Sequence, residues 1–359
     1  MKNFKLENLL RDNIKALKPY SSARDEFSGE GEYLFFDANE NALGSVGSAI
    51  DYNRYPDPYQ REVKALIAEQ KNVEINQVFL GNGSDEAIDL LFRAFCEPKQ
   101  DKVIIMPPTY GMYQVSANIN AIECIEIPLT ADYQPNTKAI IKAAKEEQAK
   151  LIFLCSPNNP TGNLLDEKKV ISIIENTNSI VVVDEAYIDF APENSMLRYL
   201  NNYPNLVVLQ TFSKAWGLAN LRLGKAFASK DIIQVFNNIK PPYNVNGYTQ
   251  KVAIQALKNV QQKNQLVQQI IEERESFKND IIKLSIVEKV YPSDANFLLV
   301  KMNGDATAIY KQLITKEIVV RNRSKVLLCE NCLRFTIGKK EENEALLKAL
   351  IELTIKAVM

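Results

Sequence analysis

One lysine of this 359-residue chain has hydroxyl side chains on its N-terminal side. Thr211 and Ser213 precede Lys214, which follows an apolar run at residues 206–210, and Arg222 stands eight residues further on. Hydroxyl and guanidinium groups are suitable donors for a phosphate. A single lysine in a loop is usually a solvated surface residue. Lys214 therefore indicates chemistry only together with the other polar segments of the chain.

A second polar segment has the composition of an anion-binding loop. Residues 81–86 read Gly-Asn-Gly-Ser-Asp-Glu and open an amphipathic stretch at residues 85–95. Glycine permits a tight turn, and the free backbone N–H groups at a helix start attract anions. Ser84 is placed both to cap the helix and to donate to a phosphate. By itself the segment is more typical of an ordinary helix N-cap.

Two further segments follow apolar runs. Residues 156–162, Ser-Pro-Asn-Asn-Pro-Thr-Gly, predict a rigid turn in which Asn159 is held extended by the proline after it. Asp184 comes directly after the apolar run 180–183, with Tyr187 three residues later. A carboxylate at the mouth of a buried strand is costly unless it is paired, and a protonated pyridine nitrogen would be a suitable partner. For residues 156–162 the alternative is a plain turn. For Asp184 the alternatives are a metal ligand or a helix cap.

Composition excludes several function classes. The chain has 43 basic and 44 acidic residues, and this balance argues against binding to nucleic acid or to a membrane surface. It has no histidine, which argues against histidine-dependent catalysis and metal sites. Its first twenty residues lack a signal-peptide core, and no apolar run approaches the roughly 18 residues of a membrane helix. Five cysteines suggest reduced thiols, and we expect a cytoplasmic protein without a metal. The spacing of Cys329 and Cys332 is best explained by chance.

Alternating elements must position these segments. Short apolar runs predict strands, separated by amphipathic stretches, at residues 78–80, 103–106, 151–155, 180–183, 206–210 and 225–228. This pattern is typical of an α/β domain with a mainly parallel sheet, where ligands bind beyond the carboxyl ends of the strands. After residue 243 a long helix (250–282) and strands at 295–301, 318–321 and 333–337 predict a smaller α+β domain.

The order of the four polar segments resembles that of the fold-type-I pyridoxal-phosphate aminotransferases, which are aspartate aminotransferase-like, over essentially the whole chain. Within them the chain is most similar to the histidinol-phosphate aminotransferases. The segments that carry this likeness are residues 17–24, 37–41, 53–58, 81–86, 107–110 and 332–338.

The resemblance implies a large domain with a mainly parallel seven-stranded sheet covered by helices, and a smaller α+β domain. The expected parts are an N-terminal segment packing with the small domain (1–45), the large cofactor-binding domain (46–245), and a connecting helix with the small domain (246–359).

The resemblance also implies roles around pyridoxal 5'-phosphate. Lys214 would form the Schiff base, Asp184 would pair with the ring nitrogen, and Asn159 and Tyr187 would hydrogen-bond the ring oxygen. Tyr110 would stack on the ring. The phosphate would be held by Ser84, Asp85, Thr211, Ser213 and Arg222, and by Tyr55 of a neighbouring subunit in a homodimer with shared active sites. For Asp85 we expect the backbone N–H to make the contact, with the carboxylate turned away.

Substrate groups are implied too. Arg334 matches the arginine that binds the substrate carboxylate, and Tyr20, Arg321 and Arg323 are candidates for the substrate phosphate. The implied reaction moves an amino group between L-glutamate/2-oxoglutarate and imidazole acetol phosphate/L-histidinol phosphate. Alternatives are a broader aromatic or aspartate aminotransferase, a threonine-phosphate decarboxylase-like enzyme, and, from another class, a regulatory module. No segment is available for the DNA-binding domain that such a module needs. Asn220 replaces a more usual glycine, and the register of Arg323 is open.

Overall fold

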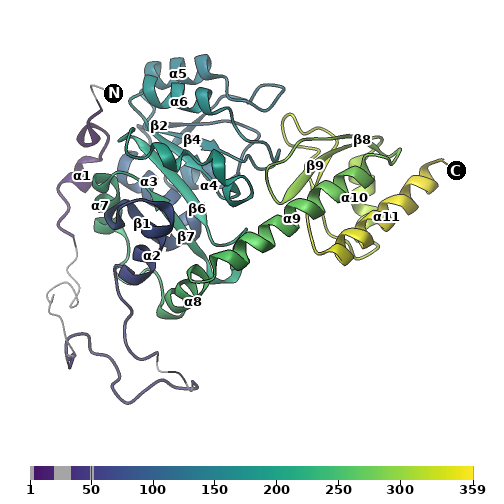
Figure 1. Ribbon diagram of the computed structural model, residues 1–359. Helices are drawn as coiled ribbons and strands as arrows, with labels where there is room; N and C mark the ends of the chain where they lie inside the picture. Colours follow the sequence, from purple (N-terminus) through teal and green to yellow (C-terminus); the bar gives the residue numbers. More distant parts are fainter. Residues whose placement is uncertain (1–3, 20–33, 49, 51, 359) are drawn as a thin grey trace.

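A seven-stranded sheet forms the larger part of the molecule (Figure 1). The computed structural model describes residues 4–19, 34–48, 50 and 52–358. The strand order is β1-β7-β6-β5-β4-β2-β3, and β7 alone runs antiparallel to its neighbours. The strands are β1 (Val78–Asn82), β2 (Lys102–Ile105), β3 (Glu123–Glu126), β4 (Leu151–Cys155), β5 (Ile180–Asp184), β6 (Leu206–Thr211) and β7 (Leu223–Phe227).

Helices cover both faces of this sheet, which explains why its central strands are continuously apolar. Successive residues of β4 point to opposite faces: Ile152 packs in one core cluster and Phe153 in the other. The first face is covered by α2 (Arg61–Lys71), α5 (Thr137–Glu146), α6 (Glu167–Asn176) and α8 (Gly247–Leu257). The second is covered by α3 (Gly83–Phe95), α4 (Met112–Ile119) and α7 (Lys230–Ile239). The prediction of a helix-covered, mainly parallel sheet is confirmed.

One strand of the large sheet, β3, was not predicted, because it does not form an apolar run in the sequence. It lies at the edge of the sheet, pairs only with β2 there, and reads Glu-Cys-Ile-Glu, with both glutamates exposed. An edge strand is only partly covered, so its sequence does not need to be apolar.

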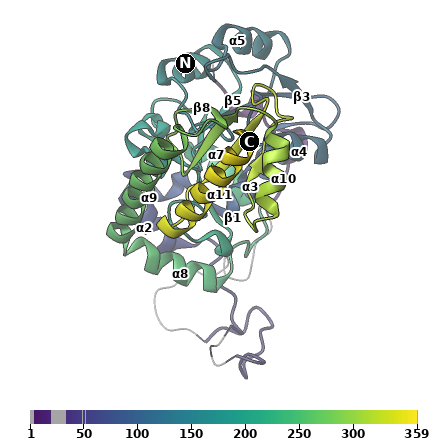
Figure 2. The ribbon, with the colours of Figure 1, turned by 90° about the vertical axis from the view of Figure 1, so that its right-hand side faces the viewer.

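A smaller antiparallel sheet follows in the order β10-β11-β9-β8. Its strands are β8 (Val287–Val290), β9 (Phe297–Met302), β10 (Arg321–Asn322) and β11 (Cys332–Thr336). The expected strand at 318–321 is reduced to the two residues of β10, and β8 was not predicted. Three helices pack against this sheet, with α11 (Lys340–Val358) between α9 (Val260–Ile281) and α10 (Ala306–Ile314) (Figure 2).

The helix predicted over residues 250–282 is in fact two helices. It breaks between α8 and α9 at Asn259, whose backbone leaves the helical region and whose amide Nδ2 donates to the Gln255 carbonyl at 2.8 Å. Asparagine side chains compete in this way for backbone hydrogen bonds. After the break, α9 runs from the large sheet to the small one (Figure 1).

The described start of the chain packs on the large sheet's helices and not beside the small domain, contrary to expectation. Phe4 and Leu9 join the apolar cluster formed with α3 and α7, and Arg11 pairs with Glu97 at 2.9 Å. This placement satisfies both the apolar face and the charge of the segment. This first segment of the chain contains η1 (Leu6–Asn8) and α1 (Asp12–Lys15). The other short helices are η2 (Ile75–Gln77), η3 (Ile188–Phe190), η4 (Pro192–Asn194), η5 (Met196–Tyr199) and η6 (Ala219–Leu221). In the described part of the chain, every helix is too short or too polar to cross a membrane.

Candidate active site

A pocket opens where β4, β5 and β6 end, at the carboxyl edge of the parallel strands. It brings together all the residues predicted for the cofactor except Tyr55. The lining residues are Gly83, Ser84, Asp85, Tyr110, Cys155, Asn159, Asp184, Ala186, Tyr187, Thr211, Ser213, Lys214 and Arg222. Five loops thus converge because parallel strands end on one edge.

One end of the pocket is built for an anion. Gly83 opens α3 with a φ of 72°, and its N–H donates to the Arg222 carbonyl. A Cβ on Gly224 would lie 2.2 Å from the backbone nitrogen of Ser84, so β7 can approach the start of α3 only because residue 224 is glycine. The hydroxyl of Thr211 donates to that of Ser213 at 3.0 Å on the facing side. Helix N–H groups, hydroxyls and a guanidinium together suit a phosphate.

The Asp85 carboxylate faces this end of the pocket, contrary to the expectation that it turns away. It accepts from the Tyr110 hydroxyl at 3.2 Å and pairs with Arg222 at 3.5 Å. The arginine neutralises the carboxylate, which is why an acidic side chain is tolerated beside an anion site. Arg222 itself has a φ of 51°. The residue after η6 is therefore left-handed at Arg222, while Asn220, which stands where glycine is more usual, lies within η6.

Asp184 ends β5 and is buried at the opposite end of the pocket. Its carboxylate accepts from the Tyr113 hydroxyl at 2.7 Å and from the N–H of Ala186 at 3.0 Å. Burial raises the pKa of Asp184 to about 6, although both hydrogen bonds act in the other direction. Among the described residues no cation forms an ion pair with it. A protonated ring nitrogen would supply the missing positive charge.

Tyr113 was missed by the sequence reasoning. It is fully buried on α4 and stacks on Phe153 with centroids 4.8 Å apart. Burial, with the Asp184 charge, raises the pKa of Tyr113 well above its usual value, so the phenol stays a proton donor. Tyr110 lies just before α4, and its ring meets that of Tyr113 edge-on with centroids 5.6 Å apart, so the spacing of three residues from a predicted cofactor contact was the available signal. A buried tyrosine hydroxyl needs a partner, and the sequence does not say which.

Lys214 lies between these two ends. Its Nζ is 5.6 Å from the centroid of the Tyr187 ring. Burial lowers the pKa of Lys214, and the nearby charges of Arg334 and Arg222 lower it further. The Tyr187 hydroxyl accepts from Asn159 Nδ2 at 3.3 Å, so the pair predicted to contact one ring oxygen is assembled. The neutral amine is the form that can attack a carbonyl or take a proton, and the lowered pKa of Lys214 favours it.

Arginines of the small sheet lie beside the pocket, and Arg334 contacts one of its lining residues. Arg334 on β11 donates from Nη1 to Asn159 Oδ1 at 2.5 Å, and its guanidinium carbon lies 5.0 Å from the centroid of the Phe297 ring. Arg321 on β10 is its cross-strand partner, and the N–H of Arg323 donates to the Cys332 carbonyl at 2.8 Å, which fixes the uncertain register. The Nε atoms of Arg323 and Arg334 are buried without a hydrogen-bond partner in the described part of the chain. Buried unpaired donors of this kind favour an anionic ligand.

Three predicted features lie elsewhere. Tyr55 is 51% exposed and stacks on Tyr243 outside the pocket, with centroids 4.5 Å apart. Tyr20 lies outside the described residues. Cys329 and Cys332 are buried free thiols whose pKa values burial raises to about 12 and about 11. Their inertness agrees with the interpretation that the spacing carries no chemistry.

Comparison with known proteins gives a consistent result. A family model described as aminotransferase class I and II matches residues 29–350. A histidinol-phosphate aminotransferase of Flavobacterium johnsoniae is 53% identical over 98% of this chain and 99% of its own length, and one of Cytophaga hutchinsonii is 52% identical over 97% and 99%. A solved histidinol-phosphate aminotransferase of Sinorhizobium meliloti, in complex with pyridoxal-5'-phosphate, matches with a TM-score of 0.79 at 24% identity, covering 90% of each chain.

The fold and the pocket thus define an aminotransferase scaffold, and the chain belongs to the class I and II aminotransferase family. The narrower resemblance, to the histidinol-phosphate aminotransferases, is also confirmed by the identity to these relatives over nearly the full chain. The structural match at 24% identity supports the fold.

Proposed function

We propose that this protein is a pyridoxal-phosphate-dependent histidinol-phosphate aminotransferase of histidine biosynthesis. It transfers an amino group between L-glutamate/2-oxoglutarate and imidazole acetol phosphate/L-histidinol phosphate. The observation that carries the proposal is the position of Lys214 in one pocket with the buried Asp184, near enough to Arg334 of the small sheet for that charge to lower its pKa. The names of the relatives favour this substrate over the aromatic, aspartate and decarboxylase alternatives.

The residues present fit pyridoxal 5'-phosphate. The phosphate would lie on the start of α3 with Ser84, Thr211, Ser213 and Arg222, and the ring nitrogen would meet Asp184. The desolvated carboxylate, which lacks a cation among the described residues, is the specific support for a protonated ring. When bound, the cofactor supplies an electron sink for the charge that develops at the substrate Cα.

Lys214 has two tasks in this proposal. Its amine would hold the cofactor covalently between turnovers and, once freed, would serve as the base that moves the proton at the substrate Cα. Both tasks need a neutral amine. The lowered pKa of Lys214, caused first by burial and then by Arg334 and Arg222, increases the neutral fraction. Tyr187 and Asn159, which are hydrogen-bonded to each other, would hold the ring oxygen in place.

The arginines select the substrate. Arg334 has a planar guanidinium suited to the carboxylate of glutamate or to the phosphate of histidinol phosphate. Arg323 and Arg321, with Tyr20, are the proposed further phosphate ligands. The unpaired Nε atoms of Arg323 and Arg334 support this assignment.

The remaining expectations belong to the proposal. The active unit is a cytoplasmic homodimer in which Tyr55 reaches the cofactor phosphate of the partner subunit; its exposure outside its own pocket supports this. The chain divides into a large domain (46–245), which lines the pocket, and a small domain (246–359).

The experiment is to add glutamate and histidinol phosphate separately to the purified holoenzyme and to follow the cofactor absorbance. Each amine should shift the spectrum to that of the pyridoxamine form, and borohydride reduction before addition should leave the cofactor attached at position 214. A spectrum that responds to glutamate but not to histidinol phosphate would contradict the substrate assignment alone. Absence of any reducible adduct would contradict the proposed chemistry.

A further inference from the structure

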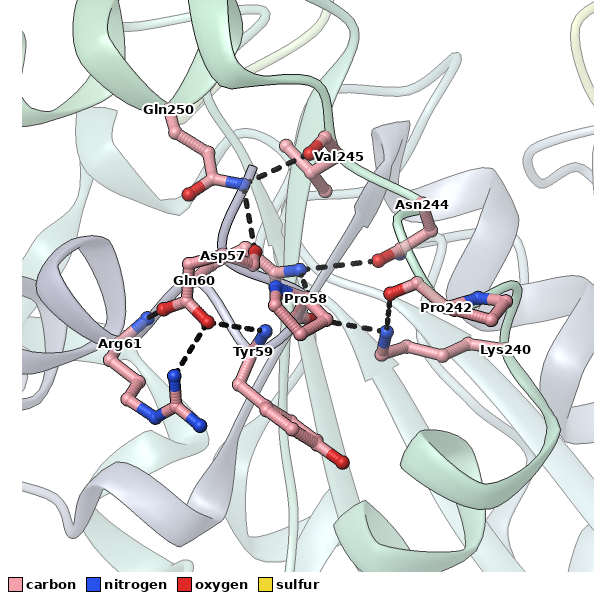
Figure 3. Close-up of polar contacts among 10 residues, drawn as sticks. All are labelled: Asp57, Pro58, Tyr59, Gln60, Arg61, Lys240, Pro242, Asn244, Val245 and Gln250. Carbon is pink, nitrogen blue, oxygen red and sulfur yellow. Dashed lines mark hydrogen bonds and ion pairs between the residues drawn. The ribbon is translucent and has the colours of Figure 1, made fainter. Parts of the chain in front are cut away.

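Tyr55 is held by a contact between two segments that are far apart in sequence. Residues 52–60, the presenting segment, precede α2, and residues 240–246, the diproline segment, follow α7. Lys240 joins them: its ammonium donates to the carbonyls of Pro58 at 3.0 Å and Pro242 at 2.7 Å (Figure 3). It also donates to the carbonyl of Pro241 at 3.2 Å. Three acceptors match the three N–H bonds of an ammonium group.

Burying the Lys240 ammonium costs free energy, because the charge loses its hydration. Lys240 is only 8% exposed, and a second buried amine, Lys64, lies close enough for its pKa to be lowered to about 8, by burial first and by the Lys240 charge next. Two buried cations in one region oppose each other electrostatically. An apolar side chain at position 240 would avoid this repulsion, yet it would leave three carbonyls without their donor.

The contacts of Lys240 lie next to both members of a stacked aromatic pair, Tyr55 and Tyr243. Tyr243 directly follows Pro242, an acceptor of Lys240, and its ring stacks on that of Tyr55 at an interplanar angle of 20°. On the other side, Tyr55 precedes the acceptor Pro58 by three residues. The same ammonium therefore fixes both halves of the aromatic pair. Gln250 adds a second link, donating to the carbonyls of Asp57 at 3.1 Å and Val245 at 3.0 Å (Figure 3).

We propose that Lys240 is a positioning residue that presents Tyr55 to the pocket of a second copy of this chain. This inference rests on the proposed function, which supplies the bound cofactor phosphate and the dimer with shared active sites. It adds that the effect of Lys240 is exerted in the partner's pocket and not in its own. Within one chain Tyr55 lines a separate hollow with Tyr243 and Tyr248, away from Lys214.

The first test compares the cofactor dissociation constants of apoproteins, titrated with pyridoxal phosphate. Lys240→Met should weaken binding by about tenfold, the loss expected when one hydrogen bond to a charged group is misplaced, and Tyr55→Phe should weaken it similarly. Lys230→Met is the matched control, because Lys230 is an exposed lysine at the other end of α7, and it should leave the constant unchanged. Tyr243→Leu provides a second variant that leaves the buried lysine in place and should show the same loss.

The decisive test uses mixed dimers in which only one subunit retains Lys214, so that the absorbance of its adduct reports one pocket. When a Lys240→Met chain is paired with a Lys214→Ala chain, the reporting pocket receives Tyr55 from an intact presenting segment, and the dissociation constant should return to the wild-type value. When a chain carrying both changes is paired with a wild-type chain, the reporting pocket should bind about tenfold more weakly. The opposite pattern would overturn the proposal, because Lys240 would then act on its own pocket.

The outcome is separable from that of the proposed function. A wild-type protein that forms no adduct with pyridoxal phosphate contradicts the proposed function. Normal wild-type binding and a weakened Tyr55→Phe variant, with Lys240→Met and Tyr243→Leu both unchanged, contradict the role of Lys240 alone.

Discussion

Two groups of polar residues differ in how completely their hydrogen-bonding atoms are paired. One is the lining of the pocket, called the cofactor wall, and the other is Arg321, Arg323 and Arg334 beside it, called the substrate wall. On the cofactor wall, Asp184 already accepts two hydrogen bonds, and the residues of the anion end contact one another. On the substrate wall, Arg323 and Arg334 keep Nε donors that lack a partner in the described part of the chain. The first arrangement suits a cofactor that stays in place, and the second suits anions that enter and leave.

The supporting elements differ in the same way. The cofactor wall is attached to the buried ends of parallel strands, whereas the substrate wall depends on β11 and on the two residues of β10. A site on buried strands is rigid because close packing leaves little room for movement. We therefore expect substitutions on the cofactor wall to affect both half-reactions, and some on the substrate wall to separate them.

The largest effect is expected for Lys214→Ala. Turnover should fall by at least about 10⁴-fold, because one change removes both covalent attachment and proton transfer. Steady-state assays with either amino donor measure this, with Lys230→Ala as a control that should match the wild type. Comparable residual activity in both variants would show that the cofactor wall is wrongly assigned.

Arg334→Lys should lower kcat/KM for both glutamate and histidinol phosphate by roughly 30-fold, or about 2 kcal/mol. Lysine keeps the charge but cannot offer the planar pair of donors that a carboxylate or phosphate accepts. Arg198→Lys, a change at an arginine remote from the pocket, should have no effect. A loss confined to one substrate would mean that Arg334 does not serve both half-reactions.

Arg323→Gln should separate the half-reactions. We expect kcat/KM for histidinol phosphate to fall by about tenfold, the value of one charge-assisted hydrogen bond, while that for glutamate changes less than about threefold. Single-turnover measurements with each donor test this. Equal losses with both donors would place Arg323 with Arg334 and remove the distinction between a shared and a phosphate-specific arginine.

Tyr113→Phe should have the smallest effect, visible mainly as a change with pH. Asp184 must be ionised to pair with the ring nitrogen, so cofactor affinity falls as the pH drops through its pKa of about 6. The Tyr113 hydrogen bond lowers that pKa, and its removal should raise it and move the acid limb of the binding profile to higher pH. Titrating apoprotein with cofactor between about pH 5 and 8 measures the shift, and Tyr203→Phe, which loses a hydroxyl bonded to Glu175 far from the pocket, is the control. An unchanged or downward-shifted limb would contradict the role of Tyr113.

Much of the cofactor wall was predictable because its residues follow recognisable strands. Asp184 and Lys214 stand directly after apolar runs, and the glycine loop opens a helix, so each residue's place along its strand was already defined. Tyr113 was not predictable, since a buried tyrosine in a helix is compatible with many partners. The direction of the Asp85 carboxylate also depended on a partner distant in sequence, Arg222.

The sequence by itself determined the α/β class, the family and the set of residues on the cofactor wall, because strand periodicity and short motifs are local properties of the chain. Only the tertiary structure decided the edge strand β3, the break between α8 and α9, and the position of the chain's start on α3 and α7. It also decided the pairing of Arg323 with Cys332 and the contact of Lys240 with Pro58. These features depend on partial burial and on contacts between distant segments, whose energies are not encoded in any single stretch of sequence.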